Sequence, residues 1–380
     1  MEKQPLGLYI HIPYCIHKCG YCDFNSHVIK QDEIDTYVDA LIVEMNHYAE
    51  KYSPGKIIKT IFLGGGTPTT LTIYQLERIL NECEKQFKVA PDAEITIEAN
   101  PATIDIGQLK SIRQTGYNRI SIGVQSFDET ELKLLDRAHG PEEIHSTVDR
   151  ARKAGFNNLS LDLMFAIPNQ SLSTWESNLR QALDKNPEHL STYNLTIEQG
   201  TAFSKLQSNG KLTMPDDDHQ LELYKRTIGL LTKRGFHHYE ISNFARPGKE
   251  CKHNITYWKN KNTLGLGAGA SSYMDGVRFK NVSLPAHYIR KVADKQAAVE
   301  HSESLESRQA MSETIMLGLR LLQGISIHQF EKRFQISFKN FFGNITSTLK
   351  EKELVTIEDD HLRLSKKGLF LADSVILEFI

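Results

Sequence analysis

The sequence is poor in cysteine, in net charge and in long apolar runs, and each shortage excludes a class of protein. Its 380 residues include five cysteines, three of them within eight positions, so we expect a reducing cytoplasm rather than a disulfide framework. A formal net charge of −2 gives no electrostatic basis for bulk binding to nucleic acid or to an anionic membrane. No apolar run approaches the length of a transmembrane helix, and the first residues lack the apolar core of a signal peptide.

A compact cysteine motif stands near the start of the chain. Cys15, Cys19 and Cys22 form a C-x3-C-x2-C array directly after a short apolar run. A buried structural cysteine occurs singly and packs as a small apolar residue, so three neighbouring thiols are not explained by packing. Thiolates are ligands of zinc and of iron–sulfur clusters. The array therefore predicts a metal centre.

Two kinds of metal centre fit this array. A structural zinc site takes four protein ligands, and the next cysteine, Cys83, lies on a predicted helix. Histidines stand within or beside the array at His11, His17 and His27. A four-iron cluster held by only three cysteines leaves one iron open for a cofactor or a substrate. The residues favour the iron–sulfur cluster, and zinc is the alternative.

The first 200 residues alternate between strand-like and helix-like patterns. Short apolar runs predict strands at 6–12, 57–63, 94–98, 119–124, 158–164 and 190–197. Apolar residues spaced three and four apart predict helices at 32–48, 72–87, 104–115, 129–136, 141–154 and 173–186. About six such βα units indicate an α/β fold with a parallel sheet and right-handed crossovers. Functional residues then belong at the carboxyl ends of the strands.

Glycine and polar residues follow these predicted strands. Gly64-Gly65-Gly66-Thr67 would let the backbone approach a ligand closely, and it lacks the lysine of a phosphate-binding P-loop. Four polar residues come at the ends of consecutive strands or just after them: Glu98, Gln125, Arg137 and Asp162. Each alone could be a satisfied structural group, but together they indicate a polar cage around a ligand. Glu98 could accept a hydrogen bond from a ribose hydroxyl.

The alternation stops beyond residue 200. Cys251-Lys-His-Asn-Ile-Thr-Tyr-Trp258 brings a thiol and an imidazole close to aromatic rings, which suits a flat iron macrocycle. The alternative is a packed aromatic loop in which His253 bonds to the backbone. From about Val282 a smaller domain is expected, with helices at 306–322 and 338–350, a hairpin around 358–361 and a last helix at 369–380.

The cysteine array, with Tyr21 before its last cysteine, resembles the cluster loop of the radical S-adenosylmethionine (SAM) superfamily. Segments 9–15 and 22–26 resemble the group that contains oxygen-independent coproporphyrinogen III oxidases and their haem-chaperone relatives. The resemblance implies a partial (β/α)6 barrel with a smaller C-terminal, winged-helix-like α+β domain. It also implies a [4Fe–4S] cluster on Cys15, Cys19 and Cys22, with SAM on the open iron. The positions that carry over as SAM-binding are Tyr9, Tyr21, Gly65, Gly66, Thr67, Glu98, Gln125, Arg137 and Asp162.

Two sequence features distinguish the branches of this group. The oxidase loop ends C-x2-C-x-C, whereas Phe24 occupies the last of these positions here. The H-N-x-x-Y-W segment resembles the motif associated with haem handling in the chaperones, which implies His253 as a haem ligand. We therefore expect a radical SAM haem chaperone that passes haem to respiratory haem proteins. The alternatives are an oxidase that decarboxylates coproporphyrinogen III and, in another class, a zinc-bound nucleic-acid adaptor.

The expected organisation has three parts, namely a barrel core at 1–200, an extension at 201–282 and a C-terminal domain at 283–380. Expected partners are haem and haem-accepting respiratory proteins, without nucleic acid. A homodimer and peripheral membrane association through those partners are further expectations.

Overall fold

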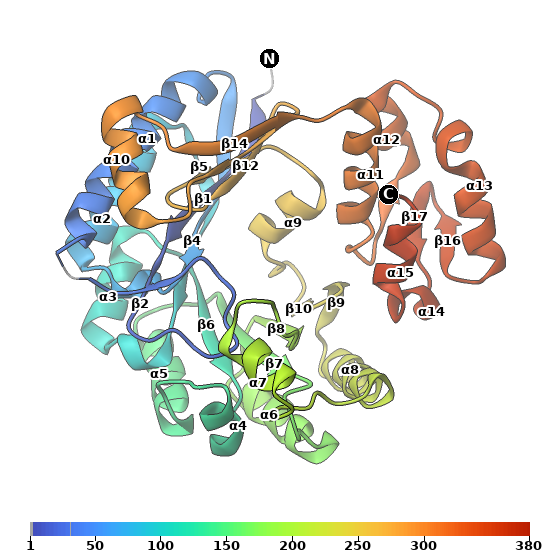
Figure 1. Cartoon of the computed structure of the whole chain (residues 1–380), viewed down its shortest axis with the longest axis horizontal. Helices are drawn as coiled ribbons and strands as arrows, with labels where there is room; N and C mark the ends of the chain where they lie inside the picture. The colour runs from blue at the N-terminus through green and yellow to red at the C-terminus, as the bar shows by residue number, and fades with distance from the viewer. Residues whose placement is uncertain (1–2, 31) are drawn as a thin grey trace.

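A series of strands and crossover helices builds the larger part of the molecule, which the computed structural model describes over residues 3–30 and 32–380 (Figure 1). The parallel strands are β1 (Gln4–Ile12), β4 (Lys56–Gly65), β5 (Val89–Ala99), β6 (Arg119–Gln125), β7 (Leu159–Phe165) and β8 (His189–Asn194). The helices between them are α1 (Ile34–Tyr52), α2 (Ile73–Gln86), α3 (Ile106–Thr115), α4 (Glu129–Leu134), α5 (Pro141–Lys153) and α6 (Leu172–Asp184). Every element predicted in the first 200 residues is present, with ends that differ by at most five residues.

These strands form the partial (β/α)6 barrel that the sequence predicted. In the described residues the main sheet runs β14-β13-β12-β11-β1-β4-β5-β6-β7-β8-β10-β9. Strands β1 and β4 to β8 pair in parallel with one another in that order, and β8 pairs antiparallel with β10. The sheet is open, since β14 and β9 are its edges. Its parallel part, which β11 joins beside β1, brings the carboxyl ends of seven strands to one rim.

Local signals fix where the crossover helices begin and end. Thr72 and Gln75 form a capping box at the start of α2, and Asp105 and Gln108 form another at the start of α3. Each box satisfies two backbone N–H groups that the first helical turn leaves without partners. Gly116, with φ of 125°, ends α3 as predicted, because glycine tolerates a positive φ.

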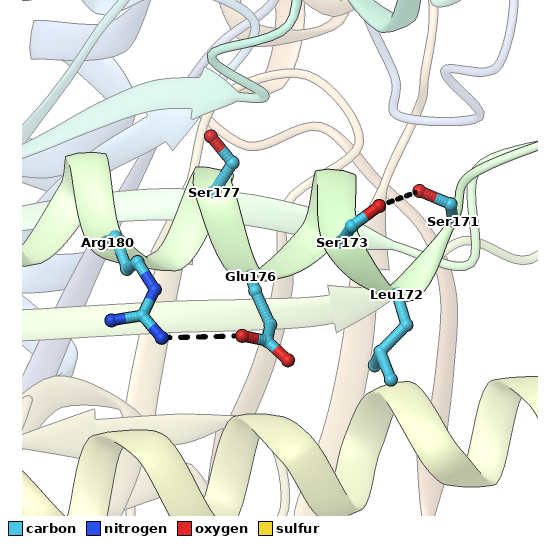
Figure 2. A pocket seen from close by; sticks show the side chains of 6 residues that line it. All are labelled: Ser171, Leu172, Ser173, Glu176, Ser177 and Arg180. Atoms are coloured by element: carbon cyan, nitrogen blue, oxygen red, sulfur yellow. Dashed lines mark hydrogen bonds and ion pairs between the residues drawn. The ribbon is translucent and has the colours of Figure 1, made fainter.

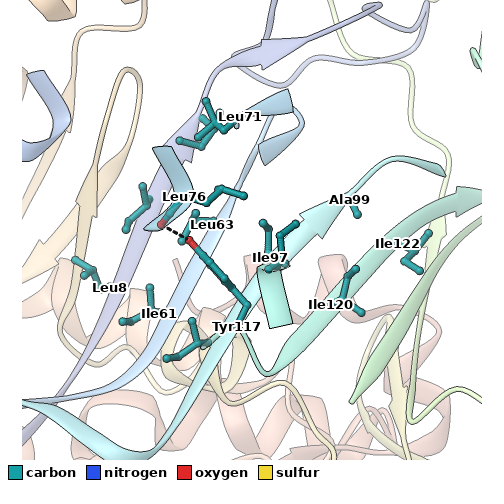
Figure 3. Close-up of a cluster of buried hydrophobic side chains, with 14 of the residues drawn as sticks. Leu8, Ile61, Leu63, Leu71, Leu76, Ile97, Ala99, Tyr117, Ile120 and Ile122 are labelled. Carbon is teal, nitrogen blue, oxygen red and sulfur yellow. Dashed lines mark hydrogen bonds between the residues drawn. The ribbon is translucent and has the colours of Figure 1, made fainter. Parts of the chain in front are cut away.

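Alternate residues of the strands face a helical layer and an inner, concave side. The helix-facing positions form the core, which Figure 3 shows with Leu8, Ile61 and Ile97 from three adjacent strands. Tyr117, fully buried below this layer, donates from its hydroxyl to the Leu76 carbonyl at 3.2 Å. The opposite, concave side carries polar residues, because the side-chain direction alternates with a period of two.

The extension after β8 completes one end of the sheet. It contains α7 (Ala202–Ser208), α8 (Asp217–Lys233), β9 (His237–Glu240), β10 (Asn243–Ala245) and α9 (Lys252–Trp258). Strands β9 and β10 pair antiparallel, and the Glu240 carboxylate accepts from Ser242 N and Asn243 Nδ2 at the turn between them. The aromatic segment at 252–258 is a helix that lies on the concave side of the sheet (Figure 1).

Four strands and one helix extend the sheet beyond β1. They are β11 (Thr263–Leu266), β12 (Ser271–Met274), β13 (Val277–Asn281), α10 (Pro285–Lys295) and β14 (Val299–Ser304). Glu44 on α1 ties them to the core, since its buried carboxylate accepts from Gly267 N, Asn281 Nδ2 and Tyr288 Oη at 2.6–2.8 Å. The boundary expected at 282/283 therefore leaves α10 and β14 attached to the main sheet rather than to the smaller domain.

The C-terminal domain has its own apolar core, formed by residues between Met311 and Phe379. Its elements are α11 (Ser307–Gly318), β15 (Ile325–Ser326), α12 (Ile327–Phe334), α13 (Phe338–Glu351), β16 (Val355–Glu358), β17 (His361–Leu364), α14 (Lys366–Leu369) and α15 (Ala372–Leu377). The hairpin expected around 358–361 is β16–β17, and the last expected helix is two short ones. Across residues 3–30 and 32–380, no helix combines the length and the apolar content that a bilayer crossing requires.

Candidate cofactor site

The three cysteines lie in the loop that leaves β1 at the carboxyl rim of the sheet. Within this loop the short strands β2 (Tyr14–Cys15) and β3 (His27–Val28) pair in parallel. Cys15, Cys19 and Cys22 are free thiols of intermediate exposure. Cys22 N donates to Cys19 O at 3.1 Å, which folds the backbone between them into a tight turn. The loop thus presents three sulfurs that do not enter the apolar core.

Hydrogen bonds from two sides hold the backbone of this loop. Gly66 N and Thr67 N donate to Ile12 O and Tyr14 O, each at 2.8 Å, and so join the end of β4 to the start of the loop. From the other side, Asn25 Nδ2 donates to Ala268 O and to Ser283 O, each at 2.9 Å. The loop is therefore fixed before any cofactor contributes.

Two of the sulfurs receive hydrogen-bond donors from the strand ends. Thr67 Oγ1 donates to Cys15 Sγ at 3.4 Å, and Arg137 Nη1 donates to Cys19 Sγ at 3.5 Å. Burial raises the pKa of both thiols, and these donors oppose that rise because they stabilise the thiolate. A hydroxyl and a guanidinium aimed at sulfur suit thiolate ligands of a cluster.

The candidate fourth ligands of a zinc site are engaged elsewhere. His17 pairs with Asp136 at 2.9 Å, while His11 bonds to Tyr9 Oη and to the Asn25 carbonyl. Cys83 is fully buried on α2, away from the loop. In the described part of the chain no three His, Cys, Asp or Glu side chains, the loop cysteines included, converge on one metal ion, so the choice between zinc and a cluster rests on the engaged fourth ligands. The donor set fits a cluster on three cysteines better than a four-ligand zinc site.

The glycine segment after β4 packs against β1 and the cysteine loop. Gly65 has φ of 109°, and a Cβ there would lie 2.3 Å from the His11 ring. A Cβ on Gly66 would lie 2.6 Å from Tyr14 O. The N–H groups of this segment bond inside the protein, since Gly65 N donates to Glu98 Oε2 at 3.1 Å and Gly66 N donates to Ile12 O. Close packing thus requires glycine at both positions, and the predicted approach of a ligand to this segment stays a prediction.

Two carboxylates face the concave side of the sheet near the rim. Burial, reinforced by the negative charge of Asp162, raises the pKa of Glu98 to about 7 despite the Gly65 N–H bond. Asp162 accepts from Ser121 Oγ at 2.9 Å and from Ser160 Oγ at 3.3 Å, and burial raises its pKa. Acids with raised pKa values in a concave site are candidates for a functional role.

The other predicted cofactor residues surround this position. Gln125 ends β6 with φ of 66°, where the register with β7 shifts, and Arg137 Nη2 donates to Gly123 O at 2.8 Å. Tyr21 lies beside Arg137 and packs edge-on against Phe203 with ring centres 6.2 Å apart. The structure therefore brings the cysteine loop and the ends of β4 to β7 to one rim.

Tyr9 and His253 lie deeper on the concave side. The Tyr9 hydroxyl bonds to His11 Nδ1 at 2.9 Å. His253 is 1% exposed, with Nδ1 bonded to Thr60 Oγ1 at 2.8 Å and Nε2 near Tyr257 Oη at 3.3 Å. Burial lowers the pKa of His253 to about 3, so the imidazole is neutral at pH 7. In this conformation both ring nitrogens have partners.

Sequence reasoning missed several residues that support the site. Ser121 and Ser160 hold Asp162, and Asn25 fixes the cysteine loop. A signal for the serines was available, because each is a polar residue at an alternate position of an apolar strand. Asn25 carried no such signal, since its partners lie more than 240 positions away.

Comparisons with known proteins agree with this arrangement. Residues 9–182 match the family model described as the radical SAM superfamily, and residues 305–371 match the HemN C-terminal domain. Together with the rim site, these matches define a radical SAM protein. Two "Heme chaperone HemW" proteins are similar over almost their whole length. The one from Lactococcus lactis is 36% identical over 100% of this chain and 98% of the relative, and that from Bacillus subtilis is 37% identical over 98% of each. The chain belongs to the HemW family.

A solved structure supports the fold over the full chain. The coproporphyrinogen III oxidase HemN from Escherichia coli, described as a radical SAM enzyme, superposes with a TM-score of 0.86 at 25% identity. The match covers 100% of this chain and 91% of HemN. The predicted fold class and the predicted family are confirmed, and radical SAM membership implies a [4Fe–4S] cluster and SAM as cofactors.

Proposed function

We propose that this protein is a haem chaperone, which binds a [4Fe–4S] cluster, SAM and haem and transfers the haem to other proteins. The observation that carries the choice within the family is Phe24, which is 65% exposed where the oxidase loop has a further cysteine. An apolar ring at this place cannot ligate iron, and it offers a contact to a flat macrocycle. The HemW relatives from Lactococcus lactis and Bacillus subtilis, which align over nearly their full length, support the same choice.

The residues that would hold the cluster are Cys15, Cys19 and Cys22. When bound, such a cluster supplies one electron to SAM on its open iron. Thr67 and Arg137 would stabilise the thiolate charge through the hydrogen bonds they already make to two of the sulfurs.

SAM would lie against the ends of β4 to β7. Its amino group needs acceptors, and the Gly65 and Gly66 N–H groups bond inside the protein, so the carbonyl oxygens of this segment are the groups left to receive it. The Glu98 and Asp162 carboxylates would accept from the ligand's polar hydrogens. Tyr9, Tyr21, Thr67, Gln125 and Arg137 complete the proposed SAM residues.

His253 is the proposed haem ligand, with one structural requirement. Its side chain is buried between α9 and β4, so iron could reach Nε2 only if α9 moved. Glu94 holds the start of this helix, since its carboxylate accepts from Lys252 N at 3.2 Å and from His253 N at 3.1 Å. A change at α9 on haem addition would therefore support this ligand.

The proposed recipients are respiratory haem proteins, and the proposed place is the cytoplasm, where thiols stay reduced. A homodimer and peripheral membrane association through the recipients are part of the same proposal. Nucleic acid is not a proposed partner, because the net charge of −2 gives the chain no overall electrostatic attraction to it.

One specific observation favours a second candidate function. The fold superposes on the HemN oxidase over the whole chain, and two half-buried carboxylates, Glu98 and Asp162, lie at the rim. This candidate is an oxidase that decarboxylates coproporphyrinogen III.

The proposed function is tested by anaerobic haem titration of the cluster-loaded protein. We expect a saturable Soret band at one haem per chain and loss of that haem to an added haem-free acceptor. Absence of saturable binding, with the cluster intact, would overturn the proposal.

A further inference from the structure

The groove between α6 and α8 lies on the outer face of the sheet, away from the cysteine loop. At one end a hollow of about 620 Å³ follows α6 from Ser171 to Arg180. A second hollow, of about 270 Å³, is lined by Arg180 and by residues 225–234 of α8 and its end. Arg180 lines both hollows, which therefore adjoin at this side chain, and the second hollow lies between the two helices. Figure 2 shows Leu172, Glu176 and Arg180 on the side of α6 that faces the neighbouring helix.

The walls of this groove are basic. Its cationic side chains are Arg180, Lys225, Arg226, Lys233 and Arg234. Glu176 is the acid among the lining residues, and its carboxylate is already paired with Arg180 at 3.4 Å and with Arg226 at 2.5 Å. Within residues 3–30 and 32–380, the side chains of Lys233 and Arg234 form neither an ion pair nor a hydrogen bond. The groove thus holds an excess of positive charge in a chain whose net charge is −2.

The spacing along α8 makes this groove a continuous feature. Lys225 and Arg226 are followed one turn later by Gly229 and Leu230, and one turn after that by Lys233 and Arg234. These pairs share one face of the helix, because residues four apart lie above one another. Basic side chains therefore stand on both sides of a low floor. Glu176 pairs with Arg180 and Arg226, whereas Lys233 and Arg234 have no acidic partner in the described part of the chain.

Gly229 at the floor has no packing reason to be glycine. Glycine is among the least favourable residues inside a helix. A Cβ added to Gly229 would meet no atom within 4 Å, and its φ is not positive. The glycine leaves the floor of the groove open at the expense of helix stability, which is the pattern expected where a ligand approaches the backbone closely.

We propose that this groove binds an acidic peptide segment of a partner protein. Clusters of arginine and lysine recognise carboxylate-rich segments through charge-assisted hydrogen bonds. A concave channel between two helices suits an extended peptide, whereas a flat bilayer surface would not reach Gly229. This proposal does not depend on haem or on the cluster.

The test uses the full chain and a rhodamine-labelled hexaglutamate, followed by fluorescence anisotropy at physiological ionic strength. We expect the wild type to bind hexaglutamate at least tenfold more tightly than a neutral hexapeptide, with affinity that falls as salt is added. Lys233→Glu with Arg234→Glu should weaken binding at least tenfold. The matched control reverses two exposed lysines of the C-terminal domain, Lys332→Glu with Lys350→Glu, and should bind as the wild type does.

Two substitutions of Gly229 separate an effect on peptide binding from an effect on folding. Gly229→Ala should leave the groove nearly open and raise the melting temperature, because alanine favours helix. Gly229→Leu should fill the floor and weaken hexaglutamate at least tenfold without lowering the melting temperature below that of the wild type.

Three outcomes would overturn the proposal. In the first, the wild type binds the acidic and the neutral peptide with equal affinity. In the second, the charge reversals in the groove and in the control lose the same affinity for hexaglutamate. In the third, Gly229→Leu binds hexaglutamate as tightly as the wild type does. Tighter binding to phosphatidylglycerol vesicles than to hexaglutamate, abolished by the same reversal, would assign the groove to lipid and also overturn it.

Discussion

The Arg137 guanidinium joins the cysteine loop to the end of β6. It donates from Nη1 to Cys19 Sγ at 3.5 Å and from Nη2 to the Gly123 carbonyl at 2.8 Å. Arg137 follows α4, and Gly123 lies on β6, so one side chain connects a thiol of the loop to the strand that ends in Gln125. The positions of the loop and of this strand end are therefore linked.

Removal of this link should weaken the cluster without unfolding the protein. Arg137→Met deletes a charged donor, and a hydrogen bond to a charged group contributes about 2 kcal/mol. We expect iron loss to a chelator to be about tenfold faster than in the wild type, measured by the decay of cluster absorbance. Cys19→Ser is the reference for complete loss of the cluster. Lys133→Met, at an exposed position of α4, should behave as the wild type does. Equal rates in Arg137→Met and the wild type would refute the link.

Ionisation of Glu98 should lower the free energy of unfolding as the pH rises. Its pKa is raised from the ordinary value of 4.5 to about 7, so its stabilising contribution is complete below 4.5 and is lost as the pH rises through 7. Glu98→Gln should therefore gain about 2 kcal/mol over the wild type between pH 5 and pH 8, after allowance for partial exposure. Urea unfolding at both pH values measures this difference.

At pH 8, above the pKa of Glu98, the same substitution should weaken SAM binding, because an ionised acceptor becomes a neutral amide. We expect about a tenfold loss by calorimetry, corresponding to one charge-assisted hydrogen bond. Glu142→Gln, which is exposed on α5, is the control. Full SAM affinity in Glu98→Gln would remove this residue from the proposed SAM site.

His253 should make the protein sensitive to acid. Its pKa falls from the ordinary 6.5 to about 3, so the neutral form contributes stability above pH 6.5 that is lost progressively as the pH falls toward 3. Between pH 7 and pH 5 the free energy of unfolding of the wild type should fall by about 2 kcal/mol more than that of His253→Asn. An unchanged difference would mean that the imidazole is not buried as described.

The same variant tests the haem ligand. Loss or shift of the Soret band in His253→Asn, with cluster content intact, is the expected result. An identical haem spectrum and affinity would exclude His253 as the haem ligand, and His237, His238 and Cys251 would be substituted next.

The sequence predicted the βα series because its helices carry apolar stripes and capping residues, and its strands are short apolar runs. The rim site was predictable for the same reason, since Glu98, Gln125 and Asp162 end strands or lie near strand ends that parallel pairing brings together. The depth of His253 was not predictable, because it depends on Thr60 and Glu94 from strands more than 150 positions earlier. The packing role of Gly65 and Gly66 was hidden likewise, since only the fold shows the His11 ring and the Tyr14 carbonyl beside them.

The attachment of α10 and β14 to the main sheet could not be predicted from the sequence either. A polar residue on α1, Glu44, holds that region through Gly267, Asn281 and Tyr288, and a buried acid in a helix carries no local sign of such distant partners. Beyond residue 282 the chain continues through α10 into β14, which pairs with β13, so the core does not end there.

The most direct test of the central claim is product analysis from one anaerobic sample. Cluster-loaded protein is incubated with SAM, a reductant and coproporphyrinogen III, and decarboxylated porphyrinogens are quantified after oxidation; haem is titrated into a second portion of the same preparation. The account predicts no decarboxylated product above the Cys19→Ser background and saturable binding of one haem per chain. Multiple turnovers to decarboxylated product, without haem binding, would contradict it and assign the oxidase function.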